Sequence, residues 1–158
     1  MEKHDGAGVA LAPGDTTAVF EIFIKTTPER LWEAITDPDL RARYSFGVRV
    51  DSDWSEGSTY TSSVPGVVEI ATGENLEVDP PRRLVHRWVA GYSEELAAEE
   101  PSRVTWEIEP QDDGTSLLTV VHDRLEGAPK TAVSVSGPGW MYVLSGLKTL
   151  LETGEPLA

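Results

Sequence analysis

The chain has 158 residues, of which 39% are apolar, and this length suits one domain with a core of its own rather than two. Its 13 basic and 27 acidic residues give a formal net charge of −14, which disfavours nucleic acid and anionic membranes as partners because both would repel the chain. The absence of cysteine excludes disulfides, thiolate metal sites and cysteine nucleophiles.

The first 16 residues are predicted to form a flexible arm. They are rich in glycine and alanine, and their apolar run, residues 9–12, is too short for a signal-peptide core or a membrane span. We therefore expect a cytoplasmic protein with one folded domain over residues 17–156.

Residues 17–25 are predicted to form a strand, because apolar and polar side chains alternate along them. Two short helices are predicted to follow. The first begins with Thr27 as its cap and Pro28 at its first position, and the second begins at Asp37-Pro38 and runs to about Tyr44.

Six further strands are predicted, because short alternating runs are separated by turn residues. The runs are 48–51, 58–63, 67–78, 84–90, 103–109 and 116–123. The turn Asp112-Asp113-Gly114 is typical of a hairpin, so neighbouring strands are expected to be antiparallel. Residues 91–101, which include four glutamates, are expected to form a long acidic hairpin loop.

A long helix is predicted near the end of the chain, because apolar residues recur there at the helical period. Its apolar stripe consists of Trp140, Leu144, Leu147 and Leu151. Pro138 fits the first turn, although residues 131–136 could form an earlier helical segment kinked there, and Gly154 ends the helix. Gly146 should cost about 1 kcal/mol relative to alanine, so it is either a tolerated surface glycine or a point of close approach.

This order of elements resembles the START-like (SRPBCC) superfamily and, within it, bacterial homologues of the activator of the heat-shock chaperone ATPase. The resemblance is carried by residues 27–38, 78–88, 102–106, 139–140 and 147–152, and it covers about residues 17–156. It implies the helix-grip fold, an α+β fold in which a curved antiparallel sheet of about six or seven strands wraps round a long C-terminal helix. The family also implies a cavity between sheet and helix, often filled by an apolar small molecule.

Strand periodicity suggests which side chains face that cavity. His86 and Trp88 share one face of their strand, and Trp106 and His122 lie on the corresponding faces of the next two strands. The candidate ligand-binding residues are Phe20, Ile22, Trp32, Tyr44, Phe46, Tyr60, His86, Trp88, Trp106, His122, Trp140, Leu144 and Leu147. Inward aromatic residues are also what a plain core contains, so both interpretations stay open.

One departure from the family concerns the mouth of the cavity. Where the wider family often has a tryptophan pair after the second short helix, this chain has Tyr44-Ser45-Phe46. The resemblance therefore does not predict the shape of the cavity mouth.

The leading hypothesis is that the domain binds a small hydrophobic or aromatic molecule. A second is a polyketide cyclase or aromatase-like enzyme in which His122 or His86 transfers protons, and a third is a chaperone-associated domain that stimulates an ATPase. No catalytic signature is found, and the spacing of His4, His86 and His122 argues against a metal site, so neither a metal nor a cofactor is expected. Besides the small molecule, a chaperone is a candidate partner, and a monomer or weak homodimer is expected.

Overall fold

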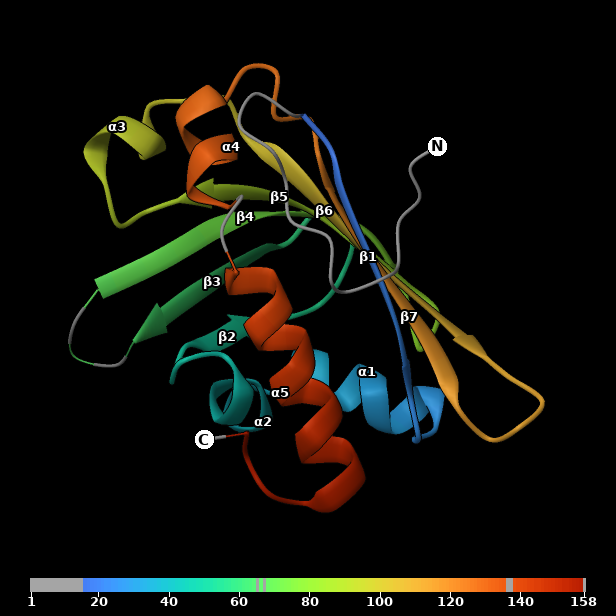
Figure 1. Cartoon of the computed structure of the whole chain (residues 1–158). Coiled ribbons are helices and arrows are strands. Elements are labelled where there is room, and N and C mark those ends of the chain that lie inside the picture. Colours follow the sequence, from blue (N-terminus) through green and yellow to red (C-terminus); the bar gives the residue numbers. More distant parts are fainter. Residues whose placement is uncertain (1–15, 65, 67, 136–137, 158) are drawn as a thin grey trace.

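The computed structural model describes residues 16–64, 66, 68–135 and 138–157, so the predicted arm, except residue 16, lies outside the described residues. A seven-stranded antiparallel sheet has the order β1-β7-β6-β5-β4-β3-β2 (Figure 1). Its strands are β1 (Ala18–Ile24), β2 (Arg49–Ser52), β3 (Thr59–Val64), β4 (Val68–Asp79), β5 (Arg83–Ala90), β6 (Ser102–Pro110) and β7 (Ser116–Asp123). The helices of the described residues are α1 (Pro28–Thr36), α2 (Pro38–Tyr44), α3 (Glu94–Ala97), α4 (Pro129–Ser134) and α5 (Gly139–Thr153).

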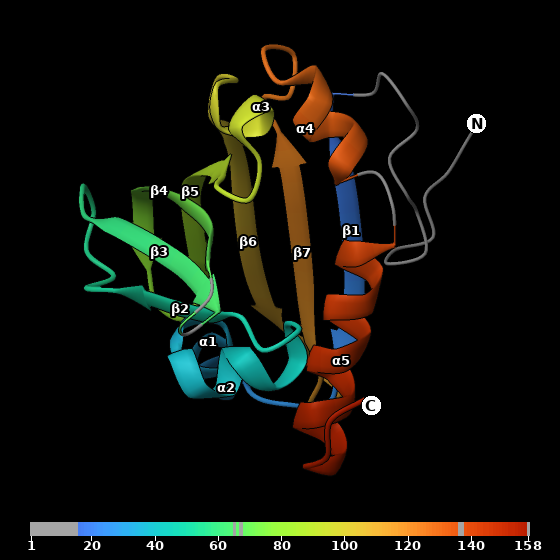
Figure 2. The same cartoon turned by 90° about the vertical axis from the view of Figure 1, so that its left-hand side faces the viewer.

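The predicted strands and their antiparallel pairing are confirmed, with bounds that agree within one residue. Strands β2 to β7 follow one another as a meander, and β1 joins the sheet beside β7. The register shifts between Ser62 and Ser63 and between Asn75 and Glu77, and such bulges bend and twist a sheet. Figure 2 shows the result: α5 lies over the β1 and β7 side, whereas β3 and β4 bend away from it.

The two short helices begin where the sequence predicts. The Thr27 hydroxyl accepts a hydrogen bond from the Arg30 amide at 3.2 Å, and the Asp37 carboxylate accepts from the amides of Asp39 and Leu40 at 2.9 and 3.0 Å. These caps satisfy amides that a helix leaves unpaired at its start. Both helices lie at the lower end of the sheet in Figure 2, where each contacts α5.

The core forms between α5 and the inner faces of β1, β5, β6 and β7. Its largest fully buried side chains include Phe20, Leu84, Trp106, Leu118, Leu144 and Leu147. The inward faces predicted for β5, β6 and β7 are therefore confirmed. Strand alternation places Thr105 on the face opposite to Trp106, and we expect this face to meet water, but Thr105 is buried because its register partners Val85 and Val121 flank it on the neighbouring strands.

The segment 91–101 is not the plain acidic loop that we expected, because it contains α3. The Glu99 carboxylate on this segment accepts hydrogen bonds from the amides of Lys130 and Thr131, each at 2.8 Å. These amides belong to the first turn of α4, where a negative charge is favourable. The earlier helical segment considered for residues 131–136 is α4, which begins at Pro129; Ser136 lies outside the described residues.

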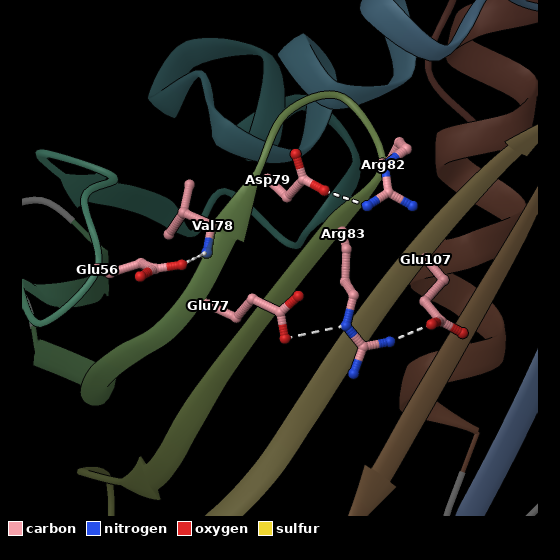
Figure 3. Close-up of polar contacts among 7 residues, drawn as sticks. All are labelled: Glu56, Glu77, Val78, Asp79, Arg82, Arg83 and Glu107. Carbon is pink, nitrogen blue, oxygen red and sulfur yellow. Dashed lines mark hydrogen bonds and ion pairs between the residues drawn. The ribbon is translucent and has the colours of Figure 1, made fainter.

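The convex face of the sheet carries charged side chains that pair across strands (Figure 3). Arg83 on β5 lies between Glu77 on β4, at 3.1 Å, and Glu107 on β6. Arg82 also pairs with Asp79 at the turn that precedes β5. Exposed pairs of this kind contribute little to stability. We therefore interpret these acidic residues as part of an ordinary solvated surface.

The edge strand β1 is covered in part by side chains of α5. The Lys148 ammonium donates to the Phe23 carbonyl at 2.8 Å, and Glu152 accepts from the Lys25 amide at 2.8 Å. Lys148 and Glu152 also pair with each other at 2.7 Å. The helix thereby satisfies backbone groups that an open sheet edge would expose to another chain.

Gly146 lies at a close approach between α5 and α2, which decides between the two interpretations of this glycine. A Cβ atom there would stand 3.2 Å from the Tyr44 Cβ and 3.3 Å from the Tyr44 carbonyl oxygen. We expect Gly146→Val to lower the free energy of unfolding by about 1–3 kcal/mol, because the added methyl groups force the two helices apart.

Urea unfolding followed by circular dichroism measures this change. The matched control is Ser145→Val, which adds the same branched side chain at the adjacent exposed position of α5 and should change stability by less than about 0.5 kcal/mol. Equal effects of the two substitutions would contradict the close-packing explanation.

Candidate functional site

A cavity of about 270 Å³ lies between the first half of α5 and the strands that bend away from it. Residues of α2, α4, β3, β4 and β5 also contribute to its wall. The lining residues are Arg41, Ser45, Phe46, Val48, Ser62, Ile70, Ala71, Trp88, Tyr92, Ser134, Val135, Gly139, Trp140 and Val143. Most of these side chains are apolar, which is typical of a small-molecule site.

A second, smaller cavity of about 30 Å³ adjoins the first. The two share Arg41, Ser62, Trp88 and Trp140 in their walls. The inner cavity is completed by Val50, Trp54, Tyr60, His86, Val104 and Trp106. A space of this size admits a water molecule or a small polar group of a ligand.

The structure separates the predicted site residues into two groups. Those that line the outer or the inner cavity are Phe46, Tyr60, His86, Trp88, Trp106 and Trp140. Those outside both linings are Phe20, Ile22, Trp32, Tyr44, His122, Leu144 and Leu147. The side chains of the second group are buried in the core or pack against it, and Phe20 and His122 contact Trp140 on the side of its ring that faces β1 and β7.

Tyr44 shows why an inward aromatic residue need not reach the cavity. It is buried, and its hydroxyl donates to the Ala34 carbonyl at 2.7 Å, which ties α2 to α1. Burial raises the pKa of Tyr44 to about 12, with a smaller lowering by the charge of Arg41. The Tyr44 hydroxyl is therefore a structural donor.

His122 is held by hydrogen bonds on both ring nitrogens. Its Nδ1 accepts from the Trp140 indole N–H at 3.3 Å, and its Nε2 lies 2.8 Å from the Ser102 hydroxyl, which in turn donates to the Trp88 carbonyl at 3.2 Å. These partners assign the proton to Nε2. Burial lowers the pKa of His122 to about 4, partly offset by the charge of Asp123.

His86 on β5 is also hydrogen-bonded through both ring nitrogens, and one of its partners is again an indole. Its Nε2 accepts from the Trp106 indole N–H at 3.2 Å, and its Nδ1 lies 3.1 Å from the Arg87 carbonyl, which assigns the proton to Nδ1. Burial lowers the pKa of His86 to about 3, against the opposing effect of the Arg87 carbonyl. Both imidazoles are therefore neutral at pH 7, and each acceptor nitrogen is occupied by an indole.

The mouth of the outer cavity is bordered by two exposed aromatic residues, Phe46 and Tyr92. The Tyr92 hydroxyl lies 2.7 Å from the Ser134 hydroxyl, which links the segment after β5 to α4. Phe46 has a φ of 58°, a conformation that is costly for a bulky residue, and Trp54 in the inner cavity has a φ of 54°. Strained residues of this kind cluster at binding sites.

Sequence reasoning missed Arg41, Ser62 and Tyr92 as lining residues. Arg41 lies three positions before the inward Tyr44 on the same short helix, so helical spacing could have placed it on the inner face. Tyr92 reaches the cavity through the packing of two segments that are distant in sequence, for which no local pattern exists.

Neither metal binding nor a membrane span finds support in the described part of the chain. Among these residues, no group of three or more histidines, aspartates and glutamates could hold a metal ion. In the same residues, every helix is too short or too polar to cross a membrane.

The family of the chain follows from its sequence and agrees with this geometry. A family model described as Activator of Hsp90 ATPase homolog 1-like protein matches residues 25–152. The chain belongs to this family. A comparison with curated proteins finds no significant match.

Solved structures with the same architecture confirm that this member of the activator-homologue family has the helix-grip, START-like fold. CalU16 from Micromonospora echinospora has a TM-score of 0.67 at 25% identity, over 89% of this chain and 76% of CalU16. An HSP90 activator from Plasmodium falciparum has 0.68 at 21%, over 90% and 99% of the two chains. The Aha1 dimer from Colwellia psychrerythraea has 0.69 at 16%, over 89% and 98%.

The two neutral histidines predict a loss of stability in acid. In the unfolded chain a histidine titrates near pH 6.5, whereas the folded values are about 3 and about 4. Between these limits the unfolded state binds more protons than the folded state, so acid favours unfolding. Above pH 6.5 both states carry neutral histidines, and the histidines do not reduce the free energy of unfolding. This free energy should fall by up to about 1.4 kcal/mol per pH unit for each histidine as the pH is lowered.

Urea unfolding at several values between pH 7.5 and pH 5 measures this slope in a range where most carboxylates stay ionised. His122→Asn removes one of the two titrations, so its slope should be about half that of the unmodified protein. A slope that is unchanged in this variant would contradict the assignment of a depressed pKa to His122.

Proposed function

We propose that this member of the activator-homologue family binds a small apolar or aromatic molecule in the cavity between α5 and β3 to β5. The observation that carries the proposal is the cavity of about 270 Å³, which the core packing leaves open although the surrounding side chains are large. An apolar hollow of this size that opens to the surface through exposed aromatic residues suits a ligand better than a folding role.

Burial of apolar surface would drive the binding. At about 25 cal/mol per Å², a ligand that buries about 200 Å² gains about 5 kcal/mol before the cost of association is subtracted. The rings of Trp88 and Trp140 supply much of this contact. Each ring is fixed by an edge-on contact with another ring, Trp88 with His122 and Trp140 with Trp106. Such rigid walls lower the entropy lost on binding.

The cyclase-like alternative requires one of the histidines to take a proton from the ligand. The lone pair of each imidazole already accepts an indole N–H, and His122 lies outside the cavity lining. General-base action by either ring would break a buried hydrogen bond and place a charge where burial opposes it. The geometry therefore favours binding without catalysis by His86 or His122.

The chaperone-associated alternative finds support in the family and in one surface feature. Phe46 and Tyr142, both exposed, stack with their ring centroids 5.0 Å apart beside the cavity mouth. Exposed aromatic pairs are common at protein contacts. An ATPase assay of a heat-shock chaperone with the wild type and with Tyr142→Ala tests this second function, in which stimulation should be lost in the variant.

Ligand binding can be tested with N-phenyl-1-naphthylamine, a neutral dye whose fluorescence rises in apolar surroundings. We expect the wild type to bind the dye and Val143→Trp to weaken this binding about tenfold or more, because the indole would fill the outer cavity. The matched control is Ser145→Trp, which places the same side chain on the exposed side of α5 and should bind normally.

A second pair of variants tests the mouth of the cavity. Phe46→Ala should weaken dye binding several-fold, whereas Phe23→Ala, which removes a similarly exposed ring from β1, should leave it unchanged. Dye binding that is equal in Val143→Trp and in the wild type would rule out the cavity as the binding site.

A further inference from the structure

Arg41 is the positively charged residue in the walls of both cavities. Its Nη1 donates to the Ile35 carbonyl at 2.9 Å, its Nε donates to the Ser45 hydroxyl at 3.3 Å, and its guanidinium lies 5.1 Å from the centroid of the Trp106 ring. All three contacts are with neutral groups. They fix the side chain in the cavity wall without neutralising its charge.

Arg41 differs from the other arginines of the described residues, which either pair with a carboxylate or, like Arg30, Arg43 and Arg124, are exposed. Arg49, Arg83 and Arg103 each pair with a carboxylate, whereas in the described part of the chain no carboxylate forms an ion pair with Arg41. Two of its five N–H donors are used, so three remain. The net charge of −14 opposes the approach of an anion from a distance, but beside an apolar cavity a half-buried cation without a counter-charge attracts an anion strongly at close range.

Tyr60 provides the second, independent observation. Its side chain lines the inner cavity together with Arg41, only 3% of the residue is exposed, and its hydroxyl has no hydrogen-bond partner within the residues that the structure describes. Burial raises the pKa of Tyr60 far above its ordinary value, so the hydroxyl keeps its proton. An unpaired buried donor is costly, and a ligand acceptor would remove that cost.

We propose that the ligand carries an anionic oxygen, a carboxylate or a phenolate, which enters the inner cavity and accepts hydrogen bonds from Arg41 and Tyr60. The ligand is thus an amphiphile whose ring system fills the outer cavity, while its charged end is recognised beneath Trp140 and Trp88. This inference rests on the proposed function, since it assigns a polar end to the molecule that the cavity binds.

The test compares naphthalene-2-carboxylate with naphthalene-2-carboxamide, which has nearly the same shape and no charge, as competitors of the naphthylamine dye. A hydrogen bond to a charged group is strong enough that the wild type should prefer the carboxylate about tenfold or more. Arg41→Met should abolish this preference, and Tyr60→Phe should lower it several-fold. Arg30→Met removes the same charge from an exposed position and should leave the preference intact.

Stability measurements separate recognition from folding. Tyr60→Phe deletes an unpaired buried hydroxyl, so the thermal midpoint of the ligand-free protein should stay the same or rise while the preference for the carboxylate falls. Dye binding without any preference between the competitors, or failure of both to displace the dye, would overturn the anion proposal and leave the apolar cavity in place. Absence of dye binding to the wild type would instead overturn the proposed function itself.

Discussion

The contact between the Trp140 indole and the inner face of the sheet separates the packed core of this domain from its cavity. The indole donates to His122 and stands edge-on to Trp106 with the ring centroids 5.4 Å apart, which fixes the first half of α5 over β6 and β7. Beyond β5 the sheet continues to bend away from α5 through its bulges toward β3. Space therefore remains on the far side of the indole, and Trp140 forms the wall between packed core and cavity.

The buried polar groups around this wall differ in how fully they are paired. His122 and His86 are hydrogen-bonded through both ring nitrogens, which fixes the indoles of Trp140 and Trp106. Neither imidazole therefore has an unpaired nitrogen that could bind a ligand. Tyr60 and Arg41 keep unused donors within the inner cavity. Asn75 Oδ1 is also buried without a hydrogen-bond partner among the described residues but lies outside both cavity linings, so it is the occurrence of Tyr60 and Arg41 together in one wall that indicates a ligand.

The sequence predicted the strands, the short helices and the inward faces because these depend on local periodicity. His86, Trp88 and Trp106 lie on the inward strand faces that alternation predicts. Alternation could not separate cavity lining from core, since that depends on the gap between sheet and helix, and Phe20 and Leu144 proved to be packed. The lining by Tyr92 and the helix within the acidic segment arise from contacts between distant parts of the chain, which periodicity does not encode.

The position of β1 has a consequence for how the chain reaches this state. Within the described residues β1 pairs with β7 alone, and Ile24 lies opposite Ser116, so β1 can form its sheet hydrogen bonds only after the chain has reached β7. Until then its apolar face stays uncovered, and closure over such a long intervening segment is slow. The pairing of β1 with β7 therefore raises the contact order of the domain, and completion of the sheet is expected to be a slow step of its folding.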